Sequence, residues 1–246
     1  MSYAKREEVR QQRLQKKRQQ RLATLIAVAG VILVVVALVG LPSLIDKYRP
    51  AGEYVSITPQ AYPFEDGRTL GDPNAIVVVE VFSDFQCSAC KNFAITTEAQ
   101  LIETEYFQNG QVYYIARQFP FMDNTSAIKA SDQAANASMC AAEQDRFWDY
   151  HAMLFANQNT SNATAYSDRR LVAFAEALGL DMKAFNNCFD DNAYAADIQA
   201  DIDRGALLNV SGTPTVFVNG EKLGVGNMVP SYDDILTAIE TALSLQ

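Results

Sequence analysis

The chain of 246 residues is long enough for one ordinary domain with additional segments, and its 49% hydrophobic residues suffice for a sizeable core. Its net charge of −9 is unevenly distributed, because residues 1–21 hold eight Lys or Arg and only two Asp or Glu, which leaves −15 on the rest of the chain. An acidic body of this kind repels the phosphates of nucleic acids, so we expect no nucleic-acid partner.

The first predicted element is a transmembrane anchor over residues 22–45. This run of 24 residues has no charged side chain and, at about 1.5 Å per residue of helix, can cross a hydrocarbon core of about 30 Å. A cleaved secretory signal has a shorter apolar region followed by a small-x-small site, whereas Ala27-Val28-Ala29 lies inside the run. The basic arm over residues 1–21 favours a cytoplasmic N-terminus, which places the body outside the cell membrane.

The segments after the anchor alternate between strand and helix patterns. Residues 46–70 contain several Pro and Gly and predict a tether. Residues 75–82, AIVVVEVF, are typical of a buried strand, and residues 87–106 follow as a helix. Residues 111–117 predict a second strand, and residues 125–207 have helical periodicity almost throughout.

The C-terminal part returns to strands and ends in a helix. TVFV at residues 215–218, followed by Asn219-Gly220, is a strong β-hairpin signal, with residues 223–225 as the partner strand. Ser231 caps a predicted terminal helix. This order of elements predicts an α/β fold with a helical block between its second strand and its hairpin.

Cys87 and Cys90, in FSDFQCSACKNF, lie where the first predicted strand is followed by a helix. Unpaired N–H groups and the dipole at a helix start stabilise an anion, so the pKa of the Cys87 thiol should be lowered. One helical turn brings Cys90 within bonding distance of Cys87. In such a pair, the outer sulfur exchanges with a partner's disulfide and the inner sulfur resolves the mixed disulfide.

Two other interpretations of this pair remain as alternatives. A zinc site generally has a second close cysteine pair or a histidine ligand. Here the other cysteines lie 50 and 98 residues beyond Cys90, and the only histidine, His151, lies in an aromatic helical stretch that is typical of core packing. A purely structural disulfide across two residues closes a very small loop and removes little chain entropy.

The other two cysteines, Cys140 and Cys188, both fall in the helical block. An even number of cysteines in an extracytoplasmic compartment favours a second disulfide. It would close a loop of 48 residues and contribute roughly 4 kcal/mol in the chain-entropy model. Two free, buried thiols are the alternative.

Two motifs together resemble the DsbA-like thiol–disulfide oxidoreductases of the thioredoxin superfamily. They are GDPNAIVVVEVFSDFQCSACKNF at residues 71–93 and VSGTPTVFVNG at residues 210–220. The resemblance covers residues 71–246 and implies a thioredoxin-like domain whose helical insertion spans about residues 122–207. It also implies an enzyme whose only redox centre is the cysteine pair, with no cofactor and no metal.

The resemblance assigns roles to individual residues. It makes Cys87 the attacking cysteine and Cys90 the resolving cysteine. It makes Pro214 a cis-proline that faces the pair, and it turns the backbone of Thr213 toward Cys87, where edge-strand hydrogen bonds can hold a bound peptide. Glu80 resembles the buried acid that family members place on the strand before the pair, where a carboxyl relays the proton of the inner cysteine.

Two features leave part of this assignment open. Asp84, in the loop before the pair, competes with Glu80 for the role of the acid. Many strong oxidants of the family carry Pro-His between the cysteines, whereas this chain has Ser88-Ala89. The direction of thiol–disulfide exchange therefore stays open.

We therefore expect a protein held in the cell membrane by one helix, with an extracytoplasmic domain that oxidises thiols of exported or secreted proteins through Cys87 and Cys90. A membrane or extracytoplasmic redox partner would restore the pair. A disulfide reductase or isomerase that uses the same pair is the alternative. A non-catalytic extracytoplasmic binding module is the alternative from another class.

Overall fold

The computed structural model describes residues 16–18, 20–38, 51–125, 129–160, 164–224 and 228–245. The chain divides into two units, Met1–Pro50 and Ala51–Gln246. In the first unit, the helix Lys16–Leu38 is long and apolar enough to cross a membrane, by length and composition. It overlaps the predicted anchor, whose end after Leu38 lies outside the described residues. The predicted domain boundaries after residues 21, 45 and 70 stay predictions.

The second unit is built on a five-stranded mixed sheet with the strand order β1-β3-β2-β4-β5. Its strands are β1 (Thr69–Leu70), β2 (Val77–Ser83), β3 (Val112–Gln118), β4 (Thr215–Val218) and β5 (Glu221–Lys222). The central strand β2 pairs in parallel with β3 and antiparallel with β4. The predicted strands near residues 75–82, 111–117 and 215–218 are confirmed.

The hairpin after β4 differs from the prediction in the position of its second strand. Val218 pairs with Glu221 and Phe217 with Lys222, so β5 begins directly after Asn219 and Gly220. The N–H of Leu223 also donates to the carbonyl oxygen of Val216 at 2.9 Å, so the predicted partner run begins two residues after the start of the strand. Its last residue, 225, lies outside the described residues.

Short helices follow β2, and longer helices form the insertion. Between β2 and β3 lie α2 (Ser88–Phe93), the π-helix η1 (Ala94–Glu98), α3 (Ala99–Ile102) and α4 (Glu105–Gln108). Between β3 and β4 lie the 3₁₀ helix η2 (Phe121–Thr125), α5 (Ala130–Ala142), α6 (Phe147–Ala156), α7 (Asp168–Ala177), α8 (Met182–Asp190) and α9 (Ala195–Leu207). The chain ends in α10 (Tyr232–Ser244), whose N-cap is Ser231, as predicted. The single helix expected over residues 87–106 is interrupted because Thr104 adopts an extended conformation before α4.

The side chains of β2 alternate between the two faces of the sheet, as a strand requires. Val79 and Val81 belong to a core that also contains Phe93 of α2 and Ile235 of α10. Phe82 belongs to a separate cluster with Val210 and Phe217. Consecutive positions of β2 therefore face different helices, which decides what Glu80 can contact.

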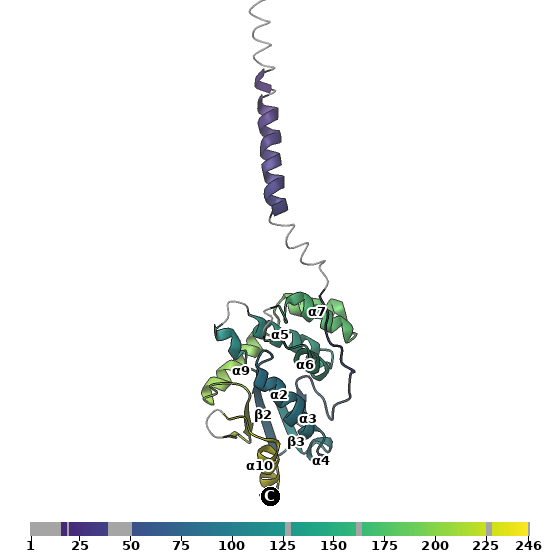
Figure 1. Cartoon of the computed structure of the whole chain (residues 1–246), viewed down its shortest axis with the longest axis vertical. Coiled ribbons are helices and arrows are strands. Elements are labelled where there is room, and N and C mark those ends of the chain that lie inside the picture. The colour runs from purple at the N-terminus through teal and green to yellow at the C-terminus, as the bar shows by residue number, and fades with distance from the viewer. Residues whose placement is uncertain are drawn as a thin grey trace, which may run out of the picture. The chain divides into compact units, whose positions relative to one another are not determined.

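The helical insertion has a hydrophobic core of its own, and the cysteine pair borders it. This core contains Phe85 and Cys90 together with buried side chains of α5 to α8. Figure 1 shows α5, α6 and α7 grouped at one end of the sheet, next to α2, whereas α10 and the C-terminus lie at the opposite end. The start of α2 thus lies at the junction of the sheet and the insertion.

Part of the predicted tether is held against the insertion. The side chain of Asn157, just after α6, accepts from the N–H of Val55 at 2.7 Å and donates to its carbonyl oxygen at 2.8 Å. The N–H of Gln60 donates to Asp149 of α6 at 3.0 Å. The ring of Tyr54 packs edge-on against Phe174 of α7, 5.5 Å between centroids. We call residues 51–62 the strap.

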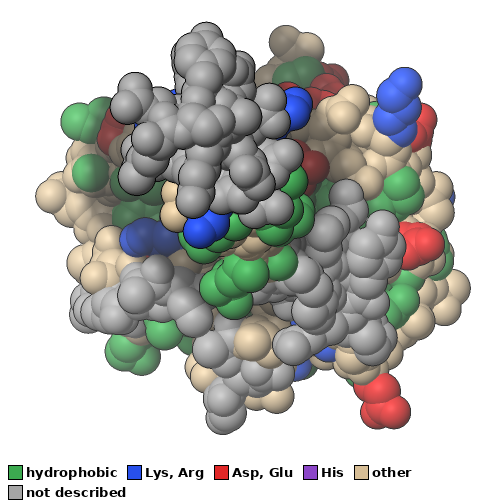
Figure 2. Space-filling view, turned by 90° about the horizontal axis from the view of Figure 1, so that it is seen from above, with side chains coloured by type: hydrophobic (Ala, Val, Ile, Leu, Met, Phe, Trp, Pro, Cys, Tyr) green, Lys and Arg blue, Asp and Glu red, His purple; other side chains and the backbone are tan. Residues whose placement is uncertain are grey.

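Charged side chains do not gather into one patch on the face drawn in Figure 2. The visible acidic and basic side chains of the described residues lie singly among polar and hydrophobic ones.

Candidate active site

Cys87 lies at the junction between the strand–loop segment and helix α2. It is the N-cap residue of α2, with an extended backbone (φ −77°, ψ 120°). Its N–H donates to the carbonyl oxygen of Asp84 at 3.0 Å, and its own carbonyl oxygen accepts from the N–H of Lys91 at 3.1 Å. Its sulfur is half-buried, whereas Cys90, one turn further, is buried, and both are free thiols. The predicted pair thus has one accessible and one shielded sulfur.

The two thiols have opposite pKa shifts. A hydrogen bond from Cys90 lowers the pKa of Cys87 to about 5, with further help from Thr213 and from the backbone N–H groups of Cys90 and Ala89. Burial raises the pKa of Cys90 well above its usual value, and the neighbouring Cys87 raises it further. At neutral pH the reduced pair therefore consists of a thiolate at Cys87 and a thiol at Cys90, which is the arrangement that nucleophilic exchange needs.

The second motif faces this pair. The peptide bond between Thr213 and Pro214 is cis. The Cys87 sulfur lies 3.3 Å from the carbonyl oxygen of Thr213 and donates to it only while the sulfur is protonated. The two motifs, 126 residues apart in the sequence, therefore meet at one sulfur. The structure places Cys87, Cys90, Thr213 and Pro214 together, as predicted.

Asp84 connects the loop before Cys87 to the insertion. One carboxylate oxygen accepts from the N–H of Gln86 and from the hydroxyl of Ser131, each at 2.7 Å, and the other accepts from the N–H of Met122 at 2.7 Å. Burial nevertheless raises the pKa of Asp84 to about 6. Its N–H lies 3.5 Å from the sulfur of Cys90 and donates to it. The backbone of Asp84, rather than its carboxylate, thus contacts the inner sulfur.

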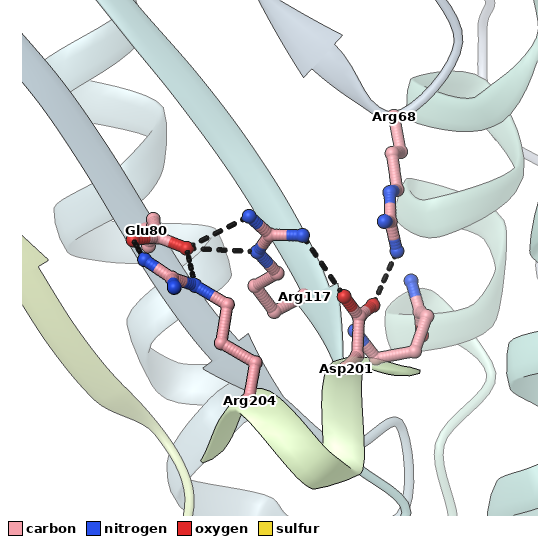
Figure 3. Close-up of polar contacts among 6 residues, drawn as sticks. Arg68, Glu80, Arg117, Asp201 and Arg204 are labelled. Atoms are coloured by element: carbon pink, nitrogen blue, oxygen red, sulfur yellow. Dashed lines mark hydrogen bonds and ion pairs between the residues drawn. The ribbon is translucent and has the colours of Figure 1, made fainter. Parts of the chain in front are cut away.

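Glu80 contacts a different group of residues from the one predicted. Its carboxylate accepts from the Nε of Arg117 at 2.9 Å and from the Nε of Arg204 at 2.6 Å. Arg117 also pairs with Asp201 of α9 at 3.0 Å, and Asp201 binds Arg68 as well (Figure 3). Burial raises the pKa of Glu80, but hydrogen bonds from Arg204 and the charge of Arg117 bring it below its usual value.

The alternation of β2 explains this result. Glu80 and Phe82 lie on the face covered by α9, whereas Val79 and Val81 face the core that contains Phe93 of α2. A carboxylate that is ionised and held by two arginines on the α9 face is not suited to relay the proton of Cys90. The expected relay role of Glu80 is therefore corrected to a place in an ion-pair network.

The second pair of cysteines forms a disulfide, Cys140–Cys188, with an S–S distance of 2.01 Å. It joins α5 to α8 inside the insertion. Both sulfurs lie in the core of the insertion, where Cys140 has no exposed surface. The predicted pairing is present, and the alternative of two free thiols does not hold.

His151 is a packing residue, as predicted. Its ring lies within 6 Å of four aromatic rings, those of Phe85, Phe147, Trp148 and Phe155. Burial lowers the pKa of His151 to about 3, so the ring is neutral near pH 7. Among the described residues, no group of three or more His, Cys, Asp or Glu side chains is arranged to hold a metal ion.

Sequence reasoning missed the side chains that hold the loop before Cys87 from the insertion. Gln158 and Tyr166 both reach the carbonyl oxygen of Phe85, at 2.7 and 2.9 Å. They lie 73 and 81 residues further along the chain. No motif surrounds either residue, and only the closure of the insertion over the sheet brings them to this loop.

Comparison with known proteins identifies the family to which this chain is similar. A family model described as thioredoxin matches residues 64–241. The probable disulfide bond formation protein D of Bacillus cereus is 26% identical over 214 residues, which cover 86% of this chain and 92% of the relative. The disulfide bond formation protein D of Bacillus subtilis is 27% identical over 177 residues, or 71% and 76% of the two chains.

A solved structure agrees with these relatives. The crystal structure of oxidised BdbD from Bacillus subtilis aligns with 78% of this chain and 100% of its own, at 25% identity and a TM-score of 0.62. The alignment confirms the expected thioredoxin-like fold with its helical insertion. The chain therefore belongs to the thioredoxin family, and within it to the DsbA-like thiol–disulfide oxidoreductases.

Proposed function

We propose that this chain oxidises thiols of exported proteins outside the cell membrane, with Cys87 and Cys90 as its redox pair. The observation that carries the proposal is the contrast between the two sulfurs. Cys87 is half-buried at a helix start with its pKa lowered to about 5, and Cys90 is buried with a raised pKa. Relatives named disulfide bond formation protein D support the oxidising direction.

The exchange proceeds in two displacements. A substrate thiolate attacks the Cys87 sulfur of the oxidised pair, the Cys87–Cys90 bond breaks, and Cys90 leaves and takes up a proton. A second substrate thiolate then attacks the substrate sulfur of the mixed disulfide and releases Cys87 as a thiolate. The substrate loses two electrons in forming its disulfide, and the Cys87–Cys90 disulfide gains them.

The stabilised thiolate of Cys87 favours oxidation of the substrate. An interaction that stabilises the reduced pair raises its reduction potential, and a pKa near 5 lies between about 7 for thioredoxin and about 3.5 for DsbA. We therefore expect a reduction potential between about −270 and about −120 mV. A value toward −270 mV would favour the reductase or isomerase alternative.

The surroundings of the cysteine pair support a protein substrate and a redox partner in the membrane. The backbone of Thr213, turned toward Cys87 by the cis bond to Pro214, is suited to accept hydrogen bonds from an extended peptide. The anchor over residues 22–45 would keep the pair next to the membrane. A membrane redox partner that accepts two electrons and two protons there would restore the disulfide.

Substitution of the two cysteines in the full-length protein tests this proposal. In Cys90→Ala, the Cys87 thiolate can still attack a substrate disulfide, but the intramolecular thiol that would displace the substrate is missing. Mixed disulfides with exported proteins should therefore accumulate on non-reducing gels. Cys87→Ala should abolish both exchange and trapping. The double variant Cys140→Ala/Cys188→Ala is the control and should keep catalysing exchange.

Parental exchange activity in Cys87→Ala would overturn the assignment of the pair. If neither the parent nor any variant oxidises a dithiol substrate while the purified protein is folded, the non-catalytic binding module gains support instead.

A further inference from the structure

The loop that carries Cys87 is held by a side chain from the helical insertion. Gln158 lies two residues after the end of α6, and its side-chain nitrogen approaches two backbone carbonyl groups of this loop. It donates to the carbonyl oxygen of Phe85 at 2.7 Å and to that of Cys87 at 2.9 Å. An amide nitrogen carries two protons, so Gln158 can serve both carbonyl groups at once.

No other side chain described at this loop makes the same pair of contacts. The hydroxyl of Tyr166 lies 2.9 Å from the carbonyl oxygen of Phe85 and 2.8 Å from that of Leu154. A tyrosine hydroxyl has one proton and can donate to only one of them at a time. Gln158 is therefore the side chain that ties the carbonyl oxygen of Cys87 to the insertion.

The orientation of this carbonyl group matters for the sulfur beside it. The peptide group between Cys87 and Ser88 is planar, so a hydrogen bond that fixes its oxygen also fixes its N–H and the start of α2. The N–H groups of Ala89 and Cys90, in that first turn, are among the donors that stabilise the Cys87 thiolate. The carbonyl oxygen of Cys87 also accepts from the N–H of Lys91 at 3.1 Å, so Gln158 is the second donor that limits how far this peptide group can tilt. A larger tilt would align the N–H groups with the sulfur for less of the time.

We propose that Gln158 is a positioning residue of the redox site, which holds the backbone of Cys87 so that the first turn of α2 points its N–H groups at the Cys87 sulfur. The inference rests on the proposed function of the pair. It adds that the insertion, besides covering the sheet, supplies part of what makes Cys87 reactive.

Gln158→Met in the full-length protein tests the proposal, because Met keeps the length of the side chain and removes both donors. The measurement is the pH dependence of Cys87 alkylation in the protein with its active-site pair reduced. We expect the midpoint to rise by about one pH unit, which means about tenfold less thiolate at pH values below the midpoint. Gln158→Asn keeps an amide but withdraws it toward the backbone, and should give a smaller rise.

Gln144→Met is the matched control. The Gln144 amide also bonds backbone groups across two helices, because it accepts from the N–H of Asp181 at 2.7 Å and donates to its carbonyl oxygen at 3.3 Å. This contact joins the end of α5 to the start of α8 and does not involve the redox loop. The control should lose stability without a change in the alkylation midpoint.

Each outcome decides between the two proposals. Folded Gln158→Met or Gln158→Asn protein with the parental midpoint overturns the positioning role and leaves the function of the pair intact. A parent protein whose Cys87 shows neither a low midpoint nor exchange overturns the proposed function, and the positioning role with it. An equal rise of the alkylation midpoint in Gln144→Met would show that general loss of stability, not the loss of the Gln158 contact, raises the midpoint. This result would also overturn the positioning role.

Discussion

Glu98 is a buried acid at the end of η1, the element that follows α2. Its buried surroundings disfavour the charged form of its carboxyl. It is the last residue of η1 and accepts a hydrogen bond from the hydroxyl of Tyr114. Burial raises the pKa of Glu98 to about 7, although the bond from Tyr114 opposes the rise. His151 lies 3.5 Å away but is neutral near pH 7 because burial lowers its pKa to about 3, so the contact is not an ion pair.

Glu98→Gln should change how stability depends on pH. The folded pKa is raised above the ordinary 4.5, so the stabilisation by the protonated carboxyl is complete below pH 4.5 and is lost as the pH rises to about 7. Between pH 4.5 and 8 the parent should lose up to about 3 kcal/mol relative to the Gln variant. Urea unfolding at several pH values measures this difference.

The exposed neighbour Glu103 provides the control for this prediction. Glu103→Gln should follow the parent at every pH. Parallel pH profiles for the parent and Glu98→Gln would show that Glu98 titrates normally in the fold.

At the scale of elements, helix α9 is attached to the sheet by buried charges. Asp201 and Arg204 of α9 pair with Arg117 of β3 and Glu80 of β2, and the carboxylates of Glu80 and Asp201 are almost completely buried. Removing one member of such a group leaves an uncompensated buried charge, which typically costs 3–5 kcal/mol. The network therefore holds α9, the last helix of the insertion, on the sheet face opposite α2.

Glu80→Gln separates this structural role from the catalytic one. The neutral side chain leaves Arg204 without its carboxylate and Arg117 with Asp201 alone. Because the Arg204 side chain is 43% exposed, the free energy of unfolding should fall by about 1–3 kcal/mol, less than for a fully buried pair. The alkylation midpoint of Cys87 and the rate of exchange should stay at parental values, because Glu80 faces α9. A variant with parental stability and altered exchange would restore Glu80 as the acid of the pair.

The disulfide between α5 and α8 stabilises the insertion as a unit. It closes a loop of 48 residues, so Cys140→Ala/Cys188→Ala should lower the free energy of unfolding by roughly 4 kcal/mol in the chain-entropy model. Cys87 should alkylate as in the parent, because the bridge lies in the core of the insertion. Mild reduction should open only the Cys87–Cys90 disulfide, which peptide mapping can detect. Equal reduction of both disulfides would indicate electron transfer between the two pairs.

At the scale of the whole molecule, the chain joins an apolar helix to an enzyme domain. The helix Lys16–Leu38 and the domain from Ala51 onward are separate units. The domain begins with the strap, whose backbone is bonded to Asn157 and Asp149 of the insertion. The folded domain therefore starts about twenty residues before the first residue of the family resemblance at residue 71.

The topology of the full chain is open to a direct test. We expect residues 22–45 to hold the chain in the membrane with the basic arm inside, because eight Lys or Arg precede the uncharged run. Protease added to intact right-side-out vesicles should digest the body and spare the arm. A body that is protected until the membrane is opened would reverse this topology.

The redox pair and the sheet strands around it are local features, and the sequence determined them. Cys87 and Cys90 are three residues apart at a strand–helix junction, and the strands and the hairpin turn have short-range patterns of two to eight residues. Such signals depend on neighbouring residues only, so they can be recognised in the sequence without knowledge of the fold. The resemblance of two motifs added the cis bond before Pro214, which the structure contains.

Only the tertiary structure decided which side chains surround the pair. The sequence places Glu80 seven residues before Cys87, but the pleat of β2 turns it toward Arg204, 124 residues away. Gln158 and the strap likewise meet partners 71 to 102 residues distant, through one or two hydrogen bonds each, which no sequence periodicity encodes. Contacts of this kind depend on how the insertion closes over the sheet, which is set by the packing of two hydrophobic cores at once.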